Sequence, residues 1–348
     1  MRYKLLGKSG LRVSELCLGT MTFGEDWGWG SSKEESRKIF NTFLEAGGNF
    51  IDTANLYTNG TSEAFLGEFM QGQRARIVLA TKYTNSAPVN DPNAGGNQRK
   101  NMMQSVEDSL KRLKTEYIDL YWLHIWDAVT PVEEVMRAFD DLVRQGKVLY
   151  IGVSDAPAWW VAQANTLAQL RGWTPFVGLQ IEYSLIERTP ERELLPMAQA
   201  CGLTVTAWSP LAGGKLTGKH LHQSGQLKAP AGTRFDGPAM EQFAKFSDRT
   251  SAIAEEVVAI AKQVERSPAQ TALAWLRQQP QTIIPIIGAR KLSQFHDNLA
   301  CLDLKLDPTQ MERLDKVSKI DLGFPQDFYA MEMVRTFRYA GMRERIDA

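Results

Sequence analysis

In the stretch Gly47-Gly48-Asn49-Phe50-Ile51-Asp52-Thr53-Ala54-Asn55-Leu56-Tyr57, a glycine turn is followed by a short apolar run and a polar loop. Short apolar runs of this kind recur along the rest of the chain. Before it, apolar residues recur at helical spacing over 39–44, behind the capping residue Ser32, and the glycine pair ends that pattern. The run 50–53 is short and apolar except for its carboxylate, which is typical of a buried strand. The stretch therefore predicts a helix, a turn, a strand and a polar loop that carries Tyr57.

Seven further apolar runs alternate with helical patterns along the chain. Most are apolar on both faces, which favours parallel strands covered by helices. Eight such strands predict a (β/α)8 TIM barrel, formed by one domain over residues 1–348. The alternative is an open doubly wound sheet, but the G-x-G-x-x-G string of that fold is absent. The eight runs are 16–19, 50–53, 77–81, 118–123, 148–153, 176–181, 204–208 and 283–287.

Three segments depart from this repeat. Residues 1–14 alternate around Lys8-Ser9-Gly10 and predict an N-terminal β-hairpin at the barrel floor. Residues 211–250 form a long insertion after the seventh run, and residues 321–348 form a tail with no clear period. Long loops that follow barrel strands often carry specificity, so we expect the insertion to cover a ligand.

Composition narrows the classes of function. The 348 residues include 40 Lys and Arg against 40 Asp and Glu, a balance that disfavours nucleic acid as a partner. No stretch reaches the roughly 18 consecutive apolar residues of a membrane helix. Three scattered cysteines without zinc or disulfide spacing, and no signal peptide, predict a cytoplasmic protein. No metal-ligand set is found, and no pattern predicts a particular oligomeric state.

Ionisable residues close consecutive runs of the predicted barrel. Asp52 ends the second run, Lys82 follows the third and His124 follows the fourth, while Tyr57 lies five residues after Asp52. Strand C-termini form the active-site face of a TIM barrel, so these groups should meet. A neighbouring ammonium would lower the phenol pKa from about 10, and the carboxylate would keep the lysine charged. Together they predict a proton donor for a carbonyl oxygen, with His124 orienting the substrate.

Simpler interpretations compete with this one. A strand-end Asp or Lys is often a structural ion pair, and a lone histidine such as His124 is often a core residue. Lys82 alone could also form a Schiff base, as in barrel aldolases.

Two longer motifs are more specific than any of these residues alone. Gly47 to Tyr57, followed by Ser62-Glu63, resembles the G-x-x-x-x-D-T-A-x-x-Y…S-E signature of the aldo-keto reductase superfamily, and Leu123-His124-Ile125-Trp126-Asp127 resembles its L-H-x-x-D segment. The resemblance extends to about Leu302. It implies a barrel that binds NADP(H) across its mouth without a Rossmann fold. It also implies Tyr57 as general acid, Lys82 and Asp52 as its modulators, and His124 as the substrate-orienting residue.

The resemblance also implies a cofactor site. Ser154 and Asp155 match a pair that binds the nicotinamide carboxamide, although the family usually has Asn at the second position, and Gln180 would complete that clamp. Trp208 would stack on the nicotinamide, and the loop from Trp208 to Lys219 would wrap the pyrophosphate. Arg290 would meet the 2′-phosphate, with Gln294 and Asn298 at the adenine. The full set is Thr20, Met21, Asp52, Ser154, Asp155, Gln180, Trp208, Ser209, Pro210, Leu211, Gly213, Lys219, Arg234, Gly288, Arg290, Gln294 and Asn298.

The main hypothesis is therefore an enzyme that reduces a small-molecule aldehyde or ketone reversibly with NADPH. Trp126 is expected at the substrate, with Trp27, Trp29, Phe324 and Phe328 as further candidates for an aromatic wall. One alternative is an NADP(H)-binding regulatory protein of the channel β-subunit type with little turnover. Another is a lysine-dependent aldolase.

Overall fold

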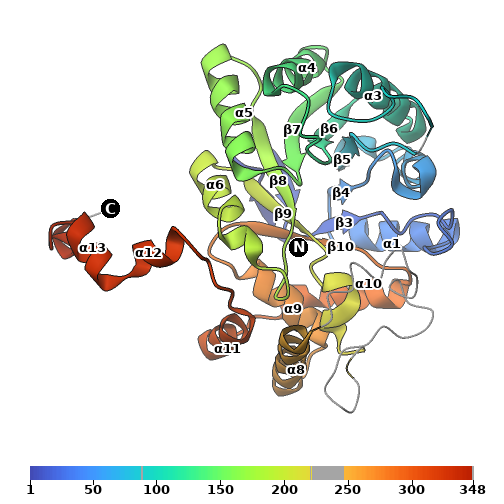
Figure 1. Cartoon of the computed structure of the whole chain (residues 1–348). Helices are drawn as coiled ribbons and strands as arrows, with labels where there is room; N and C mark the ends of the chain where they lie inside the picture. Colours follow the sequence, from blue (N-terminus) through green and yellow to red (C-terminus); the bar gives the residue numbers. More distant parts are fainter. Residues whose placement is uncertain (88, 220, 222–246, 347–348) are drawn as a thin grey trace.

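A computed structural model describes residues 1–346 except 88, 220 and 222–246. Eight parallel strands close into a barrel in chain order, with the last strand hydrogen-bonded to the first, and helices surround them (Figure 1). The predicted TIM barrel is confirmed. Its strands are β3 (Cys17–Gly19), β4 (Phe50–Asp52), β5 (Val78–Tyr83), β6 (Ile118–Leu123), β7 (Val148–Ser154), β8 (Phe176–Glu182), β9 (Thr204–Trp208) and β10 (Ile283–Ile287).

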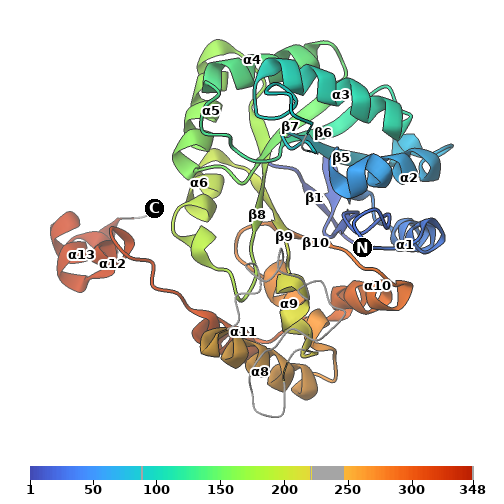
Figure 2. The ribbon, with the colours of Figure 1, turned by 45° about the vertical axis from the view of Figure 1, so that its right-hand side comes forward.

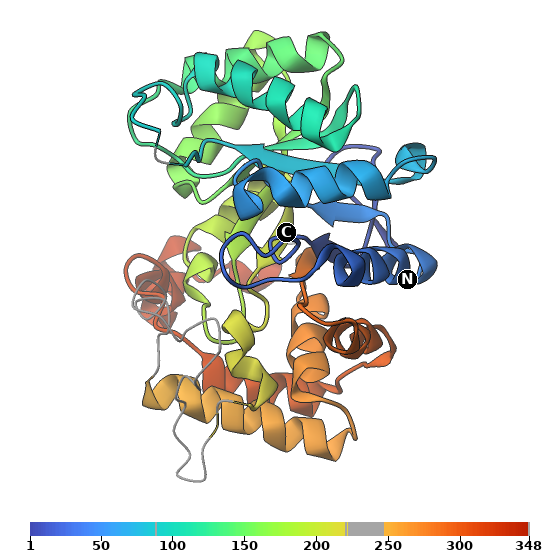
Figure 3. The ribbon, with the colours of Figure 1, turned by 90° about the vertical axis from the view of Figure 1, so that its right-hand side faces the viewer.

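The helices lie on all sides of the barrel. Figure 3 shows α3 and α4, in teal and green, on one side of the strands and the gold helix α8 on the opposite side. None of the described helices is both long and apolar enough to cross a membrane. The helices are α1 (Lys33–Glu45), α2 (Thr61–Phe69), α3 (Arg99–Leu113), α4 (Val132–Arg144), α5 (Ala158–Arg171), α6 (Leu194–Cys201), α8 (Asp248–Gln263), α9 (Pro268–Arg277), α10 (Leu292–Leu299), α11 (Pro308–Ser318), α12 (Gln326–Ala330) and α13 (Glu332–Arg338).

The predicted N-terminal hairpin is present. Strands β1 (Tyr3–Leu5) and β2 (Arg12–Ser14) pair antiparallel. The hairpin is fixed to the barrel where strands begin, because the backbone N–H of Gly7 donates to Thr204 Oγ1 at 2.7 Å. Leu6 and Val13 are fully buried among side chains of the barrel interior. The hairpin thus closes the barrel at the end opposite to the strand C-termini.

Strand alternation decides which side chains fill the barrel. On β6, Leu120 and Trp122 belong to the interior cluster, whereas Tyr121 and Leu123 pack outward against helices. The large Trp122 ring requires small neighbours. A Cβ on Gly152 would lie 2.3 Å from the Trp122 ring, and one on Gly178 would lie 2.8 Å from it. Glycines in β7 and β8 therefore make room for a single tryptophan.

Of the segments that do not fit the repeat, the insertion and the C-terminal tail both contain some regular structure. The insertion 211–250 begins with the 3-10 turns Ala212–Thr217, and its last three residues belong to α8, whose Ser247 cap forms a capping box. The tail holds two short helices, α12 and α13, which lie apart from the barrel (Figures 1 and 2). These two helices were not predicted from the sequence, because they are too short to show a helical period.

Candidate active site

The alternation that fills the barrel also brings the charged residues together. Phe50 and Asp52 share one face of β4, and Val78, Ala80 and Lys82 share one face of β5; the apolar members of both sets belong to the interior cluster. Asp52 and Lys82 therefore form the top of the barrel interior. Lys82 lies inside β5 and not after it, since β5 extends two residues beyond the predicted run and pairs with β6 through Tyr83.

Lys82 makes three contacts with its ammonium group. Its Nζ donates to Asp52 Oδ2 at 2.5 Å, to the backbone oxygen of Thr53 at 2.8 Å and to Tyr57 Oη at 3.0 Å. The Lys82 side chain is fully buried, so this cation depends on the Asp52 carboxylate. The predicted contact between ammonium and phenol is present in the structure.

The pKa shifts of this cluster differ from the expectation at one residue. Burial would lower the pKa of Lys82, but Asp52 and Tyr57 outweigh it and the net shift is upward, so the ammonium stays charged. Burial raises the pKa of Tyr57, Lys82 lowers it, and the net pKa lies above the ordinary value. The predicted net lowering of the Tyr57 pKa is wrong, because desolvation of the phenolate exceeds the stabilisation from Lys82. The phenol is protonated at neutral pH, as a proton donor must be.

His124 lies beside Tyr57, with the two ring centroids 5.9 Å apart and the rings edge to face. Burial, with a contribution from Lys82, holds the pKa of His124 well below its usual value. The ring is therefore neutral near pH 7. Its Nδ1 is buried and has no partner among the described residues, which leaves Nε2 as the nitrogen that can meet a ligand.

A buried hydroxyl network supports the segment that carries Tyr57. Ser62 Oγ lies 2.8 Å from Thr20 Oγ1 and 2.9 Å from Thr53 Oγ1, and it donates to the Thr20 backbone oxygen. Glu63, also fully buried, accepts from Thr81 Oγ1 and from Arg112 Nε. The Ser62-Glu63 pair thus ties the start of α2 to neighbouring strands and helix α3, which fixes the position of Tyr57.

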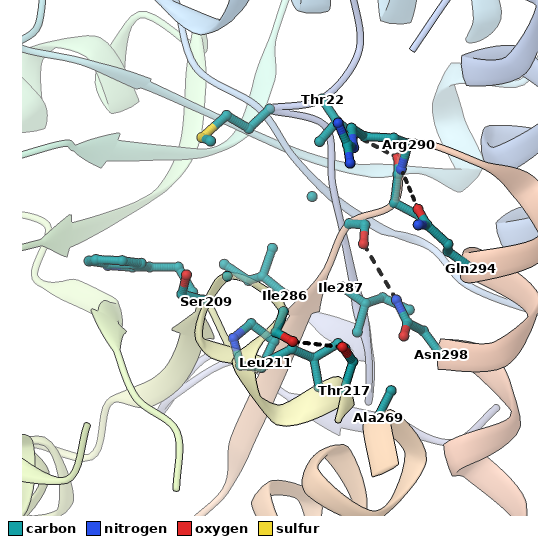
Figure 4. A pocket seen from close by; sticks show the side chains of 18 of the residues that line it. Thr22, Ser209, Leu211, Thr217, Ala269, Ile286, Ile287, Arg290, Gln294 and Asn298 are labelled. Carbon is teal, nitrogen blue, oxygen red and sulfur yellow. Dashed lines mark hydrogen bonds between the residues drawn. The ribbon is translucent and has the colours of Figure 1, made fainter. Parts of the chain in front are cut away.

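A cavity of about 1030 Å³ begins at this cluster and runs over the strand ends of the barrel. Its wall includes Tyr57 and His124. It also includes the loop after β9, with Ser209 and Leu211, and the start of α10, with Gln294 (Figure 4). The predicted cofactor residues on this wall are Met21, Asp52, Ser154, Asp155, Gln180, Trp208, Ser209, Pro210, Leu211, Gly213, Lys219, Gly288, Arg290, Gln294 and Asn298.

Several predicted ligand contacts are not on the cavity wall. Thr20 is fully buried behind it, where its hydroxyl serves the Ser62 network. Trp126 packs edge to face against Trp159 outside the cavity, whereas Trp29 does line it. Phe324 and Phe328 lie on the exposed tail. Arg234 falls outside the described residues.

Gln180 and Asp155 have partners that the sequence did not indicate. Gln180 Nε2 donates to Asp52 Oδ1 at 2.9 Å across the barrel, so its amide nitrogen holds the carboxylate that pairs with Lys82. Asp155 Oδ1 accepts the indole N–H of Trp208 at 3.1 Å. The side chains therefore link β4 with β8, and the residue after β7 with the end of β9.

The far end of the cavity is formed by the turn between β10 and α10 (Figure 4). Gln294 Oε1 accepts from the backbone N–H of Arg290 at 3.2 Å, and Asn298 Nδ2 donates to the backbone oxygen of Gly288 at 3.4 Å. These amides brace the turn. No acidic side chain pairs with the Arg290 guanidinium among the described residues, so this cation remains available to an anion.

A sequence model described as "Aldo/keto reductase family" matches residues 15–319. The chain belongs to the aldo/keto reductase family. As a member it is an oxidoreductase of carbonyl compounds that uses NADP(H).

Curated relatives cover nearly the whole chain. An aryl-alcohol dehydrogenase [NADP(+)] of Phanerodontia chrysosporium is 40% identical over 336 residues, 91% of this chain and 85% of that protein. A putative aryl-alcohol dehydrogenase of Saccharomyces cerevisiae is 37% identical, over 93% of this chain and 89% of that protein. A norsolorinic acid reductase of Aspergillus flavus is 37% identical, over 96% and 85% respectively.

The wall of the cavity in this aldo/keto reductase has the chemistry that a dinucleotide needs. The Arg290 guanidinium, which no acidic side chain of the described residues pairs, follows β10, and the neutral His124 follows β6, four strands away around the barrel. Sequence reasoning missed several wall residues, among them Ser267, Pro268 and Asp297. Ser267 caps α9 with Pro268 in the first turn, a pattern that the sequence shows and that turns the positive end of a helix toward the cavity. Asp297 accepts from Ser267 and Gln270, which its position next to Asn298 does not reveal.

Proposed function

We propose that this aldo/keto reductase interconverts aryl aldehydes or ketones and their alcohols with NADP(H), and that Tyr57 exchanges the proton with the substrate oxygen. The observation that carries the proposal is the Lys82 ammonium, 3.0 Å from Tyr57 Oη and 2.5 Å from Asp52. A charged donor at this distance stabilises the phenolate that remains after proton transfer. The bound nicotinamide supplies or accepts the hydride.

Each neighbour of Tyr57 has a distinct part in this proposal. Asp52 keeps Lys82 charged, and Gln180 holds Asp52 in place. The neutral His124 has one ring nitrogen for the substrate oxygen, and a neutral imidazole binds that oxygen without competing with Tyr57 as an acid. Arg290, with the braced turn around it, is proposed to bind the 2′-phosphate.

The aryl class of substrate is supported from two directions. The relatives named above include aryl-alcohol dehydrogenases. In this chain Trp29 lines the cavity and packs against Trp27, with ring centroids 5.7 Å apart. An aromatic wall of this kind offers a flat apolar surface to a ring.

Three unpaired cysteines are typical of a protein in a reducing compartment, and we propose the cytoplasm as the location of this enzyme.

The aldolase alternative is disfavoured by the state of Lys82. A Schiff-base lysine must lose its proton to attack a carbonyl, whereas the raised pKa and the Asp52 partner keep this amine protonated. The regulatory alternative predicts cofactor binding with little turnover, and the assay below separates it from an enzyme.

The test is a panel of aryl and aliphatic aldehydes of similar size, with NADPH consumption as the readout. We expect turnover with the aryl compounds and a kcat/KM at least about tenfold higher than for the aliphatic ones. Binding of NADPH without turnover of any carbonyl compound would contradict the enzymatic proposal and favour the regulatory alternative. Equal rates for both classes would contradict the aryl preference alone.

A further inference from the structure

Proton transfer from Tyr57 fixes where the nicotinamide must lie in the proposed reaction. The carbon that receives the hydride is bonded to the oxygen that receives the proton, so the nicotinamide has to reach the Tyr57 end of the cavity. Arg290 lines the same cavity but follows β10, on the opposite side of the barrel from β6 and His124. Asp155 is on the wall at the Tyr57 end, close enough for its charge to raise the pKa of Tyr57.

Asp155 is held in place by hydrogen bonds of its backbone and of its side chain. Its backbone N–H donates to the Gln180 oxygen at 3.3 Å, and its backbone oxygen accepts from Trp126 at 3.3 Å. Its carboxylate accepts from the Trp208 indole at 3.1 Å. The backbone φ is 42°, a left-handed conformation that Asp and Asn tolerate better than most residues. The carboxylate therefore has one position at the rim of the nicotinamide end.

Most other charges at this end are cancelled. Lys82 neutralises Asp52, and Tyr57 and His124 are neutral near pH 7. Glu182, at the end of β8, is a second carboxylate near Asp155. No cation forms an ion pair with Asp155 among the residues described. Burial raises the pKa of Asp155 to about 6, with opposing effects of Trp208 and Lys82, so the group is ionised above neutral pH.

We infer that Asp155 biases the bound cofactor toward its oxidised form, because its carboxylate, which no cation of the described residues neutralises by an ion pair, stabilises the positive charge of the NADP⁺ nicotinamide ring. The dihydronicotinamide ring of NADPH is uncharged and gains no such stabilisation. An asparagine at this position would carry no charge and would give no such preference. This inference rests on the proposed function and adds to it a preference between the two redox states of the cofactor.

The experiment compares wild type with Asp155→Asn, which keeps the shape, the acceptor for Trp208 and the tolerance of positive φ. Dissociation constants for NADP⁺ and NADPH are measured separately by titration at pH 7.5 without any carbonyl substrate. We expect the dissociation constant of NADP⁺ to rise about tenfold in the variant and that of NADPH to change less than about threefold. Asp297→Asn is the matched control, since this carboxylate lies at the adenine end and should affect both redox forms alike.

The pH dependence of wild type gives a second readout that needs no variant. Protonation of Asp155 should weaken the binding of NADP⁺ relative to that of NADPH as the pH falls from about 8 to 5. In Asp155→Asn the ratio of the two dissociation constants should not change with pH. The 2′-phosphate is common to both forms, so its own titration cancels in the ratio. A ratio unchanged by both the variant and pH would overturn the inference. Failure of wild type to bind either form would contradict the proposed function itself.

Discussion

The raised pKa of Tyr57 has a direct consequence for the pH dependence of both reaction directions. Carbonyl reduction needs the protonated phenol, which persists below the folded pKa, so the pH at which the proton is lost lies in the alkaline range. Alcohol oxidation needs the phenolate and should accelerate as pH rises. We expect kcat for reduction to stay level from about pH 7 to 9 while kcat for oxidation increases over the same range. A fall of the reduction rate between pH 7 and 8 would contradict the assignment.

Arg290 provides the second prediction for a single residue. If its guanidinium binds the 2′-phosphate, Arg290→Ala should weaken NADPH at least about tenfold and leave NADH nearly unchanged. Dissociation constants of both cofactors measure this difference. Lys305→Ala, which removes an exposed cation elsewhere, is the control. Equal losses for NADPH and NADH in Arg290→Ala would show that the arginine serves the turn and not the phosphate.

At the scale of the strands, the glycines of β7 and β8 are explained by Trp122. An added methyl group on Gly152 would meet the indole ring at 2.3 Å, and the ring is fully buried. We expect Gly152→Ala to lower the free energy of unfolding by about 1–3 kcal/mol, the usual effect of overpacking. Gly10→Ala, where no atom lies within 4 Å, is the control for the change itself. Denaturant unfolding of both variants gives the comparison, and equal stability would contradict this packing.

Strand alternation also explains how much of the site the sequence could predict. Asp52 and Lys82 each lie in a short apolar run, so their inward direction follows from a period of two. Gln180 was predicted to complete the clamp on the nicotinamide carboxamide. Its hydrogen bond to Asp52 was not predicted, because it joins residues 128 positions apart and no local spacing encodes such a contact. The predicted direction of the Tyr57 pKa shift was wrong for a related reason, because the burial of a side chain depends on the whole fold.

The arrangement of the whole molecule separates a closed barrel from a projecting tail. Phe324 and Phe337 are 84% and 74% exposed, and no residue after Asn298 lines the cavity in the described part of the chain. The main anchor of α12 is Gln326, which donates to Arg192 and Glu193. The hairpin at the other end of the chain is different, since Leu6 and Val13 are fully buried.

Truncation tests this difference between the ends of the chain. Removal of residues 323–348 should change the free energy of unfolding by less than about 1 kcal/mol, because the tail buries little apolar surface. It should also leave kcat for carbonyl reduction unchanged. Removal of residues 1–14 should prevent stable folding, because it opens the barrel floor. Loss of activity without loss of stability in the tail truncation would show that the tail contributes to the substrate site.

The role of Tyr57, next to the Lys82 ammonium, as the proton donor is tested most directly by a single turnover of Tyr57→Phe with NADPH already bound and an aryl aldehyde added. Tyr329→Phe on the exposed tail is the control. The predicted result is a reduction rate at least about a thousandfold below wild type, with NADPH affinity within about threefold of it. A Tyr57→Phe rate close to that of wild type would mean that another group delivers the proton, and the central claim would be wrong.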